Sequence, residues 1–423
     1  MEYLEKFNLA TKNTVYFLLN VKEQALLKDL ALKLQLSVQD IKIISEILKD
    51  LSTWDKKYIK FIENLLTKFY SNIKTKSNNP KIIKNKIISE IKQYYENTKS
   101  EKKKYIEKTL KEASIDGLKC IKKDISSNIF GACPVYSEKT VCCGLKTLDV
   151  VQNCPFNCSY CTIQTFYGND FIFVNNLKEK LNTLNLDKKK FYHIGTGQSS
   201  DALVWGNKYN ILDELINFAK NNPNVLLELK TKSSNISYFK DNIIPKNIVC
   251  SWTINTNKVI QNEELGTASL ESRLNSAKQL ANHGIKIAFH FHPIIFYEGL
   301  ENEYNEIAQY IQENFSPKDI SFISFGSLTF IKPVIKQIRE KKVNTKILQM
   351  PTALDPNGKI TYPKDLKIYL YKMMYENFKK FHDKVFFYLC METRDIWQEV
   401  FSFCYKDNEE FLQDFGLKTL NFK

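Results

Sequence analysis

The stretch that decides the fold is residues 145–161, which read LKTLDVVQNCPFNCSYC. Its first part, Leu145–Val151, is an apolar run typical of a buried strand. Its second part spaces Cys154, Cys158 and Cys161 as C-x3-C-x2-C within one tight turn. We therefore expect the three thiols on a loop beyond the carboxyl end of a strand, where barrel enzymes keep their active sites.

Ligand number and spacing indicate which metal these thiols suit, because thiolates bind both iron–sulfur clusters and zinc. A structural zinc site needs four closed ligands. The local run supplies three, which fits a [4Fe–4S] cluster with one open iron. Cys133, Cys142 and Cys143 lie upstream and would complete a zinc tetrahedron, so zinc stays an alternative. Unliganded core or redox thiols are a second alternative.

The rest of the chain beyond residue 145 alternates short β-branched or aromatic runs with amphipathic segments. The candidate strands are Leu145–Val151, Phe191–Gly195, Val225–Thr231, Asn247–Asn255, Ile285–Ile294 and Asp319–Leu328. Six such βα units in series predict a parallel sheet buried on both faces. We expect an α/β fold built as a partial (β/α)6 TIM-type barrel, with a doubly wound open sheet as the alternative.

Four regions are predicted along the chain. Residues 1–118 form an all-helical, Lys-rich domain, with a helix-start signal at Ser37 and Asp40. Residues 119–144 connect it to the barrel at 145–350, and residues 351–423 form a C-terminal α+β extension. In that extension we expect a helix over 362–382, a strand over 385–390 and a last helix around Trp397.

Composition restricts the function class only loosely. The net charge is +14, but three of the 61 basic residues are arginine, so a solvated lysine face competes with a nucleic-acid surface. No run is long and apolar enough to span a bilayer, and the first 20 residues lack signal-peptide features. We expect a cytoplasmic protein whose ten cysteines are reduced thiols or metal ligands.

The cysteine spacing, with Tyr160 before its last thiol and a βα series after it, resembles the radical S-adenosylmethionine superfamily. Further motifs resemble its spore photoproduct lyase (DNA repair photolyase-like) family over roughly residues 145–405. They are Gln164-Thr165, Gly197, Ser199-Ser200-Asp201, Thr231-Lys232, Trp252–Asn255, Gly266-Thr267, Arg273-Leu274, Pro293 with Glu298-Gly299, Lys332-Pro333, Tyr388–Glu392 and Trp397. Each motif is weak alone, but their order along the chain supports the family.

The resemblance implies a lyase that uses a reduced [4Fe–4S] cluster and S-adenosylmethionine to generate a 5′-deoxyadenosyl radical. Cys154, Cys158 and Cys161 would ligate the cluster. The residues expected around S-adenosylmethionine are Ser199, Asp201, Lys232, Thr253 and Asn255. The family's reaction repairs a thymine dimer lesion, so the resemblance implies DNA as the substrate and an electron donor such as flavodoxin or ferredoxin.

One residue departs from the family pattern. Spore photoproduct lyases place a hydrogen-donating cysteine where this chain has Gln198, and an amide cannot take that role. Either Cys250 or the Cys142-Cys143 pair donates instead, or the substrate is different. Two rival functions therefore remain: a radical enzyme acting on another substrate, and a non-catalytic, zinc-stabilised nucleic-acid-binding protein.

Two histidines complete the set of candidate residues. His290 and His292 alternate along a predicted strand and therefore share one of its faces. That face either lines the barrel near the substrate or holds hydrogen-bonded core groups.

Overall fold

The computed structural model describes residues 3–12, 14–54, 57–73, 79–133, 136–340 and 345–422. The chain divides into two compact units. The first runs to Lys103 and also includes Ile335–Pro351, while the second comprises Lys104–Val334 and Thr352–Lys423. Among the described residues, no helix is both long enough and apolar enough to cross a membrane.

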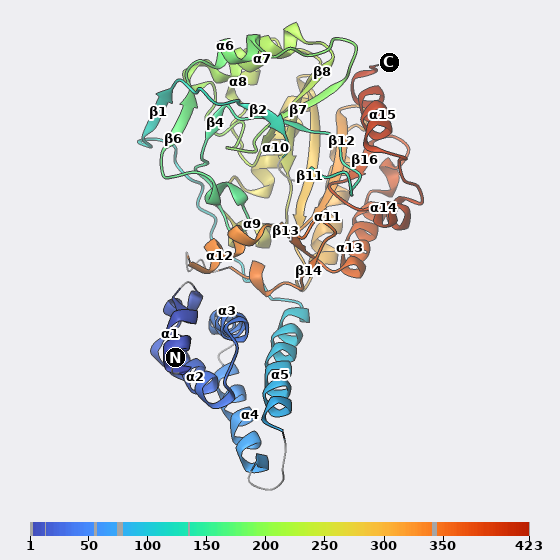
Figure 1. The fold of residues 1–423 in the computed structure, drawn as a ribbon. Coiled ribbons are helices and arrows are strands. Elements are labelled where there is room, and N and C mark those ends of the chain that lie inside the picture. The colour runs from blue at the N-terminus through green and yellow to red at the C-terminus, as the bar shows by residue number, and fades with distance from the viewer. Residues whose placement is uncertain are drawn as a thin grey trace. The chain divides into compact units, whose positions relative to one another are not determined.

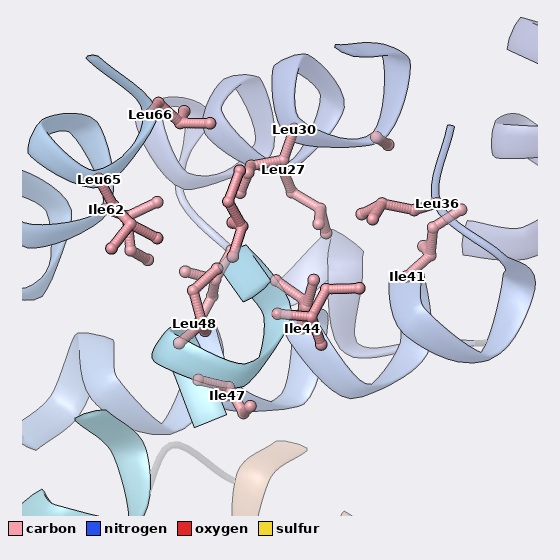
Figure 2. Close-up of a cluster of buried hydrophobic side chains, with 14 of the residues drawn as sticks. Leu27, Leu30, Leu36, Ile41, Ile44, Ile47, Leu48, Ile62, Leu65 and Leu66 are labelled. Carbon is pink, nitrogen blue, oxygen red and sulfur yellow. The ribbon is translucent and has the colours of Figure 1, made fainter. Parts of the chain in front are cut away.

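The first unit is helical. Its helices are α1 (Tyr3–Thr11), α2 (Val21–Leu34), α3 (Val38–Trp54), α4 (Tyr58–Ile73) and α5 (Pro80–Ser100), with 3-10 turns at Val15–Leu18 and Ile347–Gln349. Side chains of Leu and Ile from α2, α3 and α4 meet in one buried cluster, shown in Figure 2. Leu27, Leu30, Ile44 and Leu48 are fully buried there.

Local capping explains where two of these helices begin. Asn20 and Glu23 form a reciprocal capping box at the start of α2, each side chain accepting from the other's backbone N–H. Ser37 and Asp40 exchange the same kind of bonds before α3, at 3.1 and 3.0 Å. The helix start predicted at Ser37 is therefore confirmed.

A buried ion pair attaches the segment Ile335–Pro351 to this unit. Arg339 donates from Nε and Nη2 to the two carboxylate oxygens of Asp50, at 2.8 and 2.7 Å. Tyr95 from α5 also donates to Asp50, at 2.8 Å. Because Asp50 is almost completely buried, this bidentate pair satisfies a charge that would otherwise be costly.

The helical region is shorter than the sequence pattern predicts. We expected helices up to about residue 118, but α5 ends at Ser100 and no helix occurs over 101–119. Residues from Lys104 onward belong to the second unit, where Tyr105 donates to Glu263 at 2.7 Å and Ala113 donates to the Gly266 carbonyl at 2.8 Å. These partners lie far away in sequence, so local periodicity does not reveal them.

The second unit contains an eight-stranded sheet, curled into a half-barrel, in the order β16-β12-β11-β9-β8-β7-β3-β2 (Figure 1). Its strands are β2 (Phe130–Ala132), β3 (Lys146–Leu148), β7 (Tyr192–Thr196), β8 (Val225–Thr231), β9 (Ile248–Thr253), β11 (Lys286–Ile294), β12 (Ile320–Ser327) and β16 (Phe386–Leu389). All neighbouring pairs are parallel except β2 with β3. The predicted partial barrel is confirmed.

Helices connect and cover these strands. They are α6 (Leu177–Asn182), α7 (Ile211–Asn221), α8 (Ser237–Lys240), α9 (Asn257–Glu263), α10 (Leu270–Asn282), α11 (Leu300–Asn314), α13 (Lys364–Asn377), α14 (Arg394–Phe401) and α15 (Asn408–Leu420); α12 (Lys332–Glu340) spans the boundary between units. Each of the six strands predicted from the sequence overlaps a strand of this sheet. The sequence pattern also predicts a strand over 385–390, but places it in a C-terminal extension outside the barrel. That strand is β16, and it joins the barrel sheet beside β12.

Short strands support the loops at the rim. They are β1 (Cys120–Lys123), β4 (Val151–Gln152) and β6 (Phe171–Val174) in one sheet, β5 (Asn157–Cys158) with β10 (Glu264–Leu265), and β13 (Thr329–Phe330), β15 (Ile360–Thr361) and β14 (Ala353–Leu354) in another. The run predicted as one strand over Leu145–Val151 is thus divided between β3 and the start of β4.

Helix α15 fills the amino-terminal end of the half-barrel. The ring of Phe415 lies 4.9 Å from that of His193 on β7, and 5.3 and 5.2 Å from those of Phe322 on β12 and Phe386 on β16. Gly416 faces the Phe191 ring so closely that a Cβ would stand 2.7 Å from it. Helix α15 therefore contacts β7 as well as β12 and β16, strands that are separated from β7 in the order of the sheet.

Truncating the core of the helical unit tests its packing. We expect Leu30→Ala, at a fully buried position of α2, to lower the free energy of unfolding by about 2–5 kcal/mol. Leu32→Ala on the same helix is the matched control, because Leu32 is 39% exposed and should lose no more than about 1 kcal/mol. Urea unfolding followed by circular dichroism measures both, and equal losses would contradict the packing described.

Candidate active site

The loop that carries the three cysteines is fixed by a short two-stranded ladder. Strand β5, which contains Cys158, pairs in antiparallel fashion with β10. Beside it, Ser159 donates its backbone N–H to the Glu263 carbonyl at 2.8 Å. Gly266 follows β10 with a φ of +85°, a conformation that favours glycine. The loop is thus held by residues from a distant part of the half-barrel.

The three thiols are close enough to influence one another's ionisation. Burial, followed by the negative charges of Asp201 and Cys161, raises the pKa of Cys154 to about 12. Burial also raises the pKa of Cys158 well above its usual value, although Lys232 partly opposes this. Such thiols become stable thiolates when a metal supplies positive charge, so the donor set fits a metal cluster.

Spacing distinguishes a cluster from a single ion. In the described part of the chain, no three His, Cys, Asp or Glu side chains are placed to hold one metal ion together. In an iron–sulfur cube each thiolate binds a different iron, so its ligands need not converge on one point. The cysteine spacing is therefore compatible with a cluster.

A buried polar layer lies directly against the cysteine loop. Glu264, fully buried, forms an ion pair with Arg273 at 2.7 Å between Oε2 and Nη2. Its Oε1 accepts from Asn255 Nδ2 at 2.9 Å and from the Tyr160 hydroxyl. Although burial alone would raise the pKa of Glu264, Arg273 and Lys232 lower it below its usual value. The carboxylate is therefore the ionised form.

Lys232 brings positive charge to the thiols. Burial alone would lower the pKa of Lys232, but the negative charges of Cys158 and Glu264 raise it above its usual value. Its Nζ lies 5.7 Å from the centre of the Tyr160 ring, at cation–π distance. A lysine in this position can bond an anionic ligand group next to the cysteines.

The other residues predicted around the cofactor divide into two groups. Asp201 is committed to the loop itself: it accepts from the backbones of Leu203, Val204 and Lys232 and from the Thr231 hydroxyl, at 2.6–3.0 Å. Asn255 is also committed, since its Oδ1 accepts from Tyr304 at 2.6 Å while its Nδ2 bonds Glu264. Both side chains therefore fix the positions of neighbouring loops and side chains through hydrogen bonds.

Ser199 lies in the loop after β7, and Thr253 is the last residue of β9. Ser199 donates to the Val151 carbonyl at 2.7 Å. Thr253 uses its backbone carbonyl to accept from Arg273 at 2.8 Å. Gly197, with a φ of +104°, lets the loop cross β8, because a Cβ there would stand 2.7 Å from the Lys230 carbonyl oxygen.

A cavity of about 150 Å³ opens beside the cysteine loop at the carboxyl ends of β11, β12 and β16. It is lined by Tyr160, His292, Pro293, Gly326, Ser327, Leu328, Thr329, Cys390 and Met391. Gly326 is required there, since a Cβ would stand 2.9 Å from the His292 ring. The volume suits one small ring, below the range of drug-sized ligands.

A chain of hydrogen bonds runs through the barrel interior to this cavity. Glu228 bridges His193 and His290, at 2.7 and 2.5 Å. Ser324 then links His290 to His292, at 2.6 and 3.0 Å. The prediction that the two histidines share one strand face is confirmed, and that face lines both the core and the cavity.

Residues 145–385 match the family model described as spore photoproduct lyase, which is more than half of the chain. The chain belongs to the spore photoproduct lyase family.

Two relatives in this family show the extent of the similarity. A spore photoproduct lyase from Clostridium acetobutylicum is 28% identical over 181 residues, covering 41% of this chain and 54% of that protein. One from a Geobacillus species is 24% identical over 213 residues, covering 47% of this chain and 61% of that protein. The chain therefore spans between half and two thirds of the length of these relatives.

Solved structures share the fold. A spore photoproduct lyase complexed with dinucleoside spore photoproduct aligns with a TM-score of 0.55 at 20% identity, covering 64% of this chain and 82% of that one. A substituted form with bound AdoMet and dinucleoside spore photoproduct gives 0.53 at 22% identity, with the same coverage. At these identities the likeness establishes the half-barrel alone.

Two positions bear on the hydrogen donor in this spore photoproduct lyase fold: Gln198, which replaces the family's cysteine, and Cys250, a predicted substitute for it. Gln198 lies half-buried in the loop after β7. Cys250 lies on β9, fully buried, and burial raises its pKa. It is absent from the lining of the cavity described above. A role for Cys250 as hydrogen donor therefore stays a prediction.

Several site residues escaped the sequence analysis. Glu264, Glu228 and Ser324 carry the polar contacts of the site, yet each stands in an unremarkable stretch of sequence. Cys390 belongs to a motif that the family resemblance included, but no role was assigned to it. A buried acid is recognised only when its partners are known, and those partners come from other strands.

Breaking the Glu264–Arg273 pair should destabilise the half-barrel. We expect Arg273→Met to lower the free energy of unfolding by about 3–5 kcal/mol, because Glu264 then remains buried without its paired guanidinium and only Lys232 opposes its charge. Lys33→Met, which removes the exposed pair with Asp29, is the control and should cost less than about 1 kcal/mol. Denaturant unfolding compares the two, and a loss as small as the control's would refute the role of the pair.

The interior histidines should make stability depend on pH. Burial, followed by the positive charge of Lys230, lowers the pKa of His290 from 6.5 to about 4, and that of His292 also lies well below its usual value. Between about pH 6.5 and 4 the unfolded chain binds protons that the folded chain refuses, so stability falls as the pH falls. Each of these histidines can lower the free energy of unfolding by up to about 1.4 kcal/mol for each pH unit within this range.

We expect His292→Asn to reduce the slope of the unfolding free energy against pH by the contribution of one histidine, up to about 1.4 kcal/mol per pH unit. The carboxylate of Glu228, whose pKa His290 and His193 hold well below its usual value against the effect of burial, loses its stabilisation only at lower pH. Unfolding free energies measured in urea from pH 7 to 4.5 separate the two windows. An unchanged slope in the variant would show that His292 does not stay neutral in the folded protein.

Proposed function

We propose that this protein is a radical S-adenosylmethionine lyase that repairs a thymine dimer lesion in DNA. The observation that carries the proposal is the cysteine loop itself. Its three thiols lie at the carboxyl end of a half-barrel, and two of them, those of Cys158 and Cys161, favour the charged form of the neighbouring Lys232. Family membership supports the reaction class, and the relatives' complexes with dinucleoside spore photoproduct support the lesion as substrate.

The chain's own residues would take distinct parts. Cys154, Cys158 and Cys161 would hold a [4Fe–4S] cluster, which with bound S-adenosylmethionine supplies a carbon radical able to remove a hydrogen atom from the substrate. Lys232 would bond the methionine carboxylate. Ser199 and Thr253 would contact the cofactor from neighbouring strand ends.

The framework residues would orient these groups. Asp201 and Asn255 position the strand-end loops through the hydrogen bonds described above. Glu264 holds Tyr160 between two cluster cysteines and keeps the Lys232 charge in place. A site whose supporting bonds are complete before the ligand arrives loses little entropy on binding.

Partners and location follow from the same proposal. The net charge of +14 suits DNA phosphates, and reduction of the cluster would need a flavodoxin- or ferredoxin-like electron donor. All ten cysteines are free thiols, which fits a reducing compartment such as the cytoplasm. The rival substrate, a different lesion or a molecule other than DNA, is favoured by Gln198.

Anaerobic purification tests the proposal. We expect a brown protein with about four irons and four sulfides per chain, which forms 5′-deoxyadenosine on reduction with S-adenosylmethionine and converts dinucleoside spore photoproduct to thymines. Cys158→Ala should lose the iron and the 5′-deoxyadenosine, whereas Cys404→Ala, in a loop after α14, should retain both. A colourless protein with one bound zinc would refute the enzyme, and intact lesions beside normal 5′-deoxyadenosine would refute the substrate.

A further inference from the structure

The candidate cavity contains one thiol among its described lining residues, that of Cys390. Strand β16 ends immediately before it, and the Cys390 backbone N–H donates to the Phe325 carbonyl at 2.8 Å. This bond continues the ladder between β16 and β12, so the position of Cys390 is set by the sheet. Tyr160, from between the cluster cysteines, lines the same cavity.

We propose that Cys390 is the hydrogen-atom donor that completes the lyase reaction, in place of the cysteine absent at position 198. The inference rests on the proposed function. It adds to that function a residue, on a different strand, that faces the space next to the cysteine loop.

Other groups near the cavity are poorly suited to this step. The thioether of Met391 has no S–H bond. The hydroxyl hydrogen of Tyr160 is directed to Glu264 and is therefore engaged away from the cavity. Cys250 is fully buried on β9 and does not line this space.

The surroundings of Cys390 keep its thiol protonated. An antiparallel bridge, in which Val141 N–H donates to the Glu392 carbonyl at 2.9 Å, brings Cys142 close to Cys390. Burial, followed by the negative charges of Cys142 and Cys133, raises the pKa of Cys390 above its usual value. A thiolate has no hydrogen atom to give, so a raised pKa preserves the form that the step requires.

The step balances as a homolytic transfer. The S–H bond of Cys390 breaks and a C–H bond forms at the thymine carbon radical left after the lesion is cleaved. Cys390 then carries the unpaired electron as a thiyl radical. It recovers a hydrogen atom from the methyl group of 5′-deoxyadenosine, the nucleoside that the proposed function forms, so no external oxidant or reductant is consumed in this exchange.

Solvent deuterium traces the donor, because a thiol hydrogen exchanges with water. In D2O, with dinucleoside spore photoproduct as the probe, we expect the wild-type protein to release thymine product that carries deuterium. Cys390→Ala and Cys390→Ser should still form 5′-deoxyadenosine but lose deuterium incorporation and most of the thymine product. Cys250→Ala is the matched control and should retain both. Adding Gln198→Cys to Cys390→Ala should restore deuterated product.

A second measurement needs no cofactor. Iodoacetamide labelling followed by peptide mass spectrometry should modify Cys390 before Cys250, and the dinucleoside should protect Cys390. Absence of 5′-deoxyadenosine from the wild type would refute the proposed function. Normal deuterated product from Cys390→Ala, or labelling of Cys250 before Cys390, would overturn the inference alone. If the wild type forms 5′-deoxyadenosine but leaves the dinucleoside unchanged, no thymine radical is available to accept a hydrogen atom from Cys390. That result would overturn the inference and the proposed substrate, but not the radical chemistry.

Discussion

The site depends on one buried ion pair, between Glu264 and Arg273. Both side chains are fully buried, so removing either one would leave the other as a buried charge without its direct partner. Through Glu264 the pair fixes Tyr160 and Asn255, and through β10 it fixes the strand that carries Cys158. Buried contacts thereby hold the loop that carries the three cysteines.

The sequence predicts those parts of the molecule that local patterns determine. Buried parallel strands are apolar runs, and Ser37 with Asp40 marks a helix start within four residues. The cysteine spacing is equally local, so the loop was located correctly after the first strand. Family resemblance then named Lys232 as a cofactor residue, and the structure places its charge against the thiols.

The remaining features are determined by contacts between distant residues. Residues 104–118 continue the Lys-rich composition of the helices, yet Tyr105 bonds Glu263 in the half-barrel. Helix α15 is amphipathic like many surface helices, and only the ring contacts of Phe415 show that it fills the barrel end. The role of Glu264 likewise depends on Arg273 and Tyr160, which no local window contains together.

The return of Ile335–Pro351 to the helical unit affects how this protein can be divided. Because Arg339 supplies the cation for Asp50, the first hundred residues are an incomplete folding unit without that later segment. A fragment starting at the half-barrel would in turn present Arg339 without its carboxylate. The two units are therefore interleaved along the chain, so a gene for one alone would require a splice as well as a truncation.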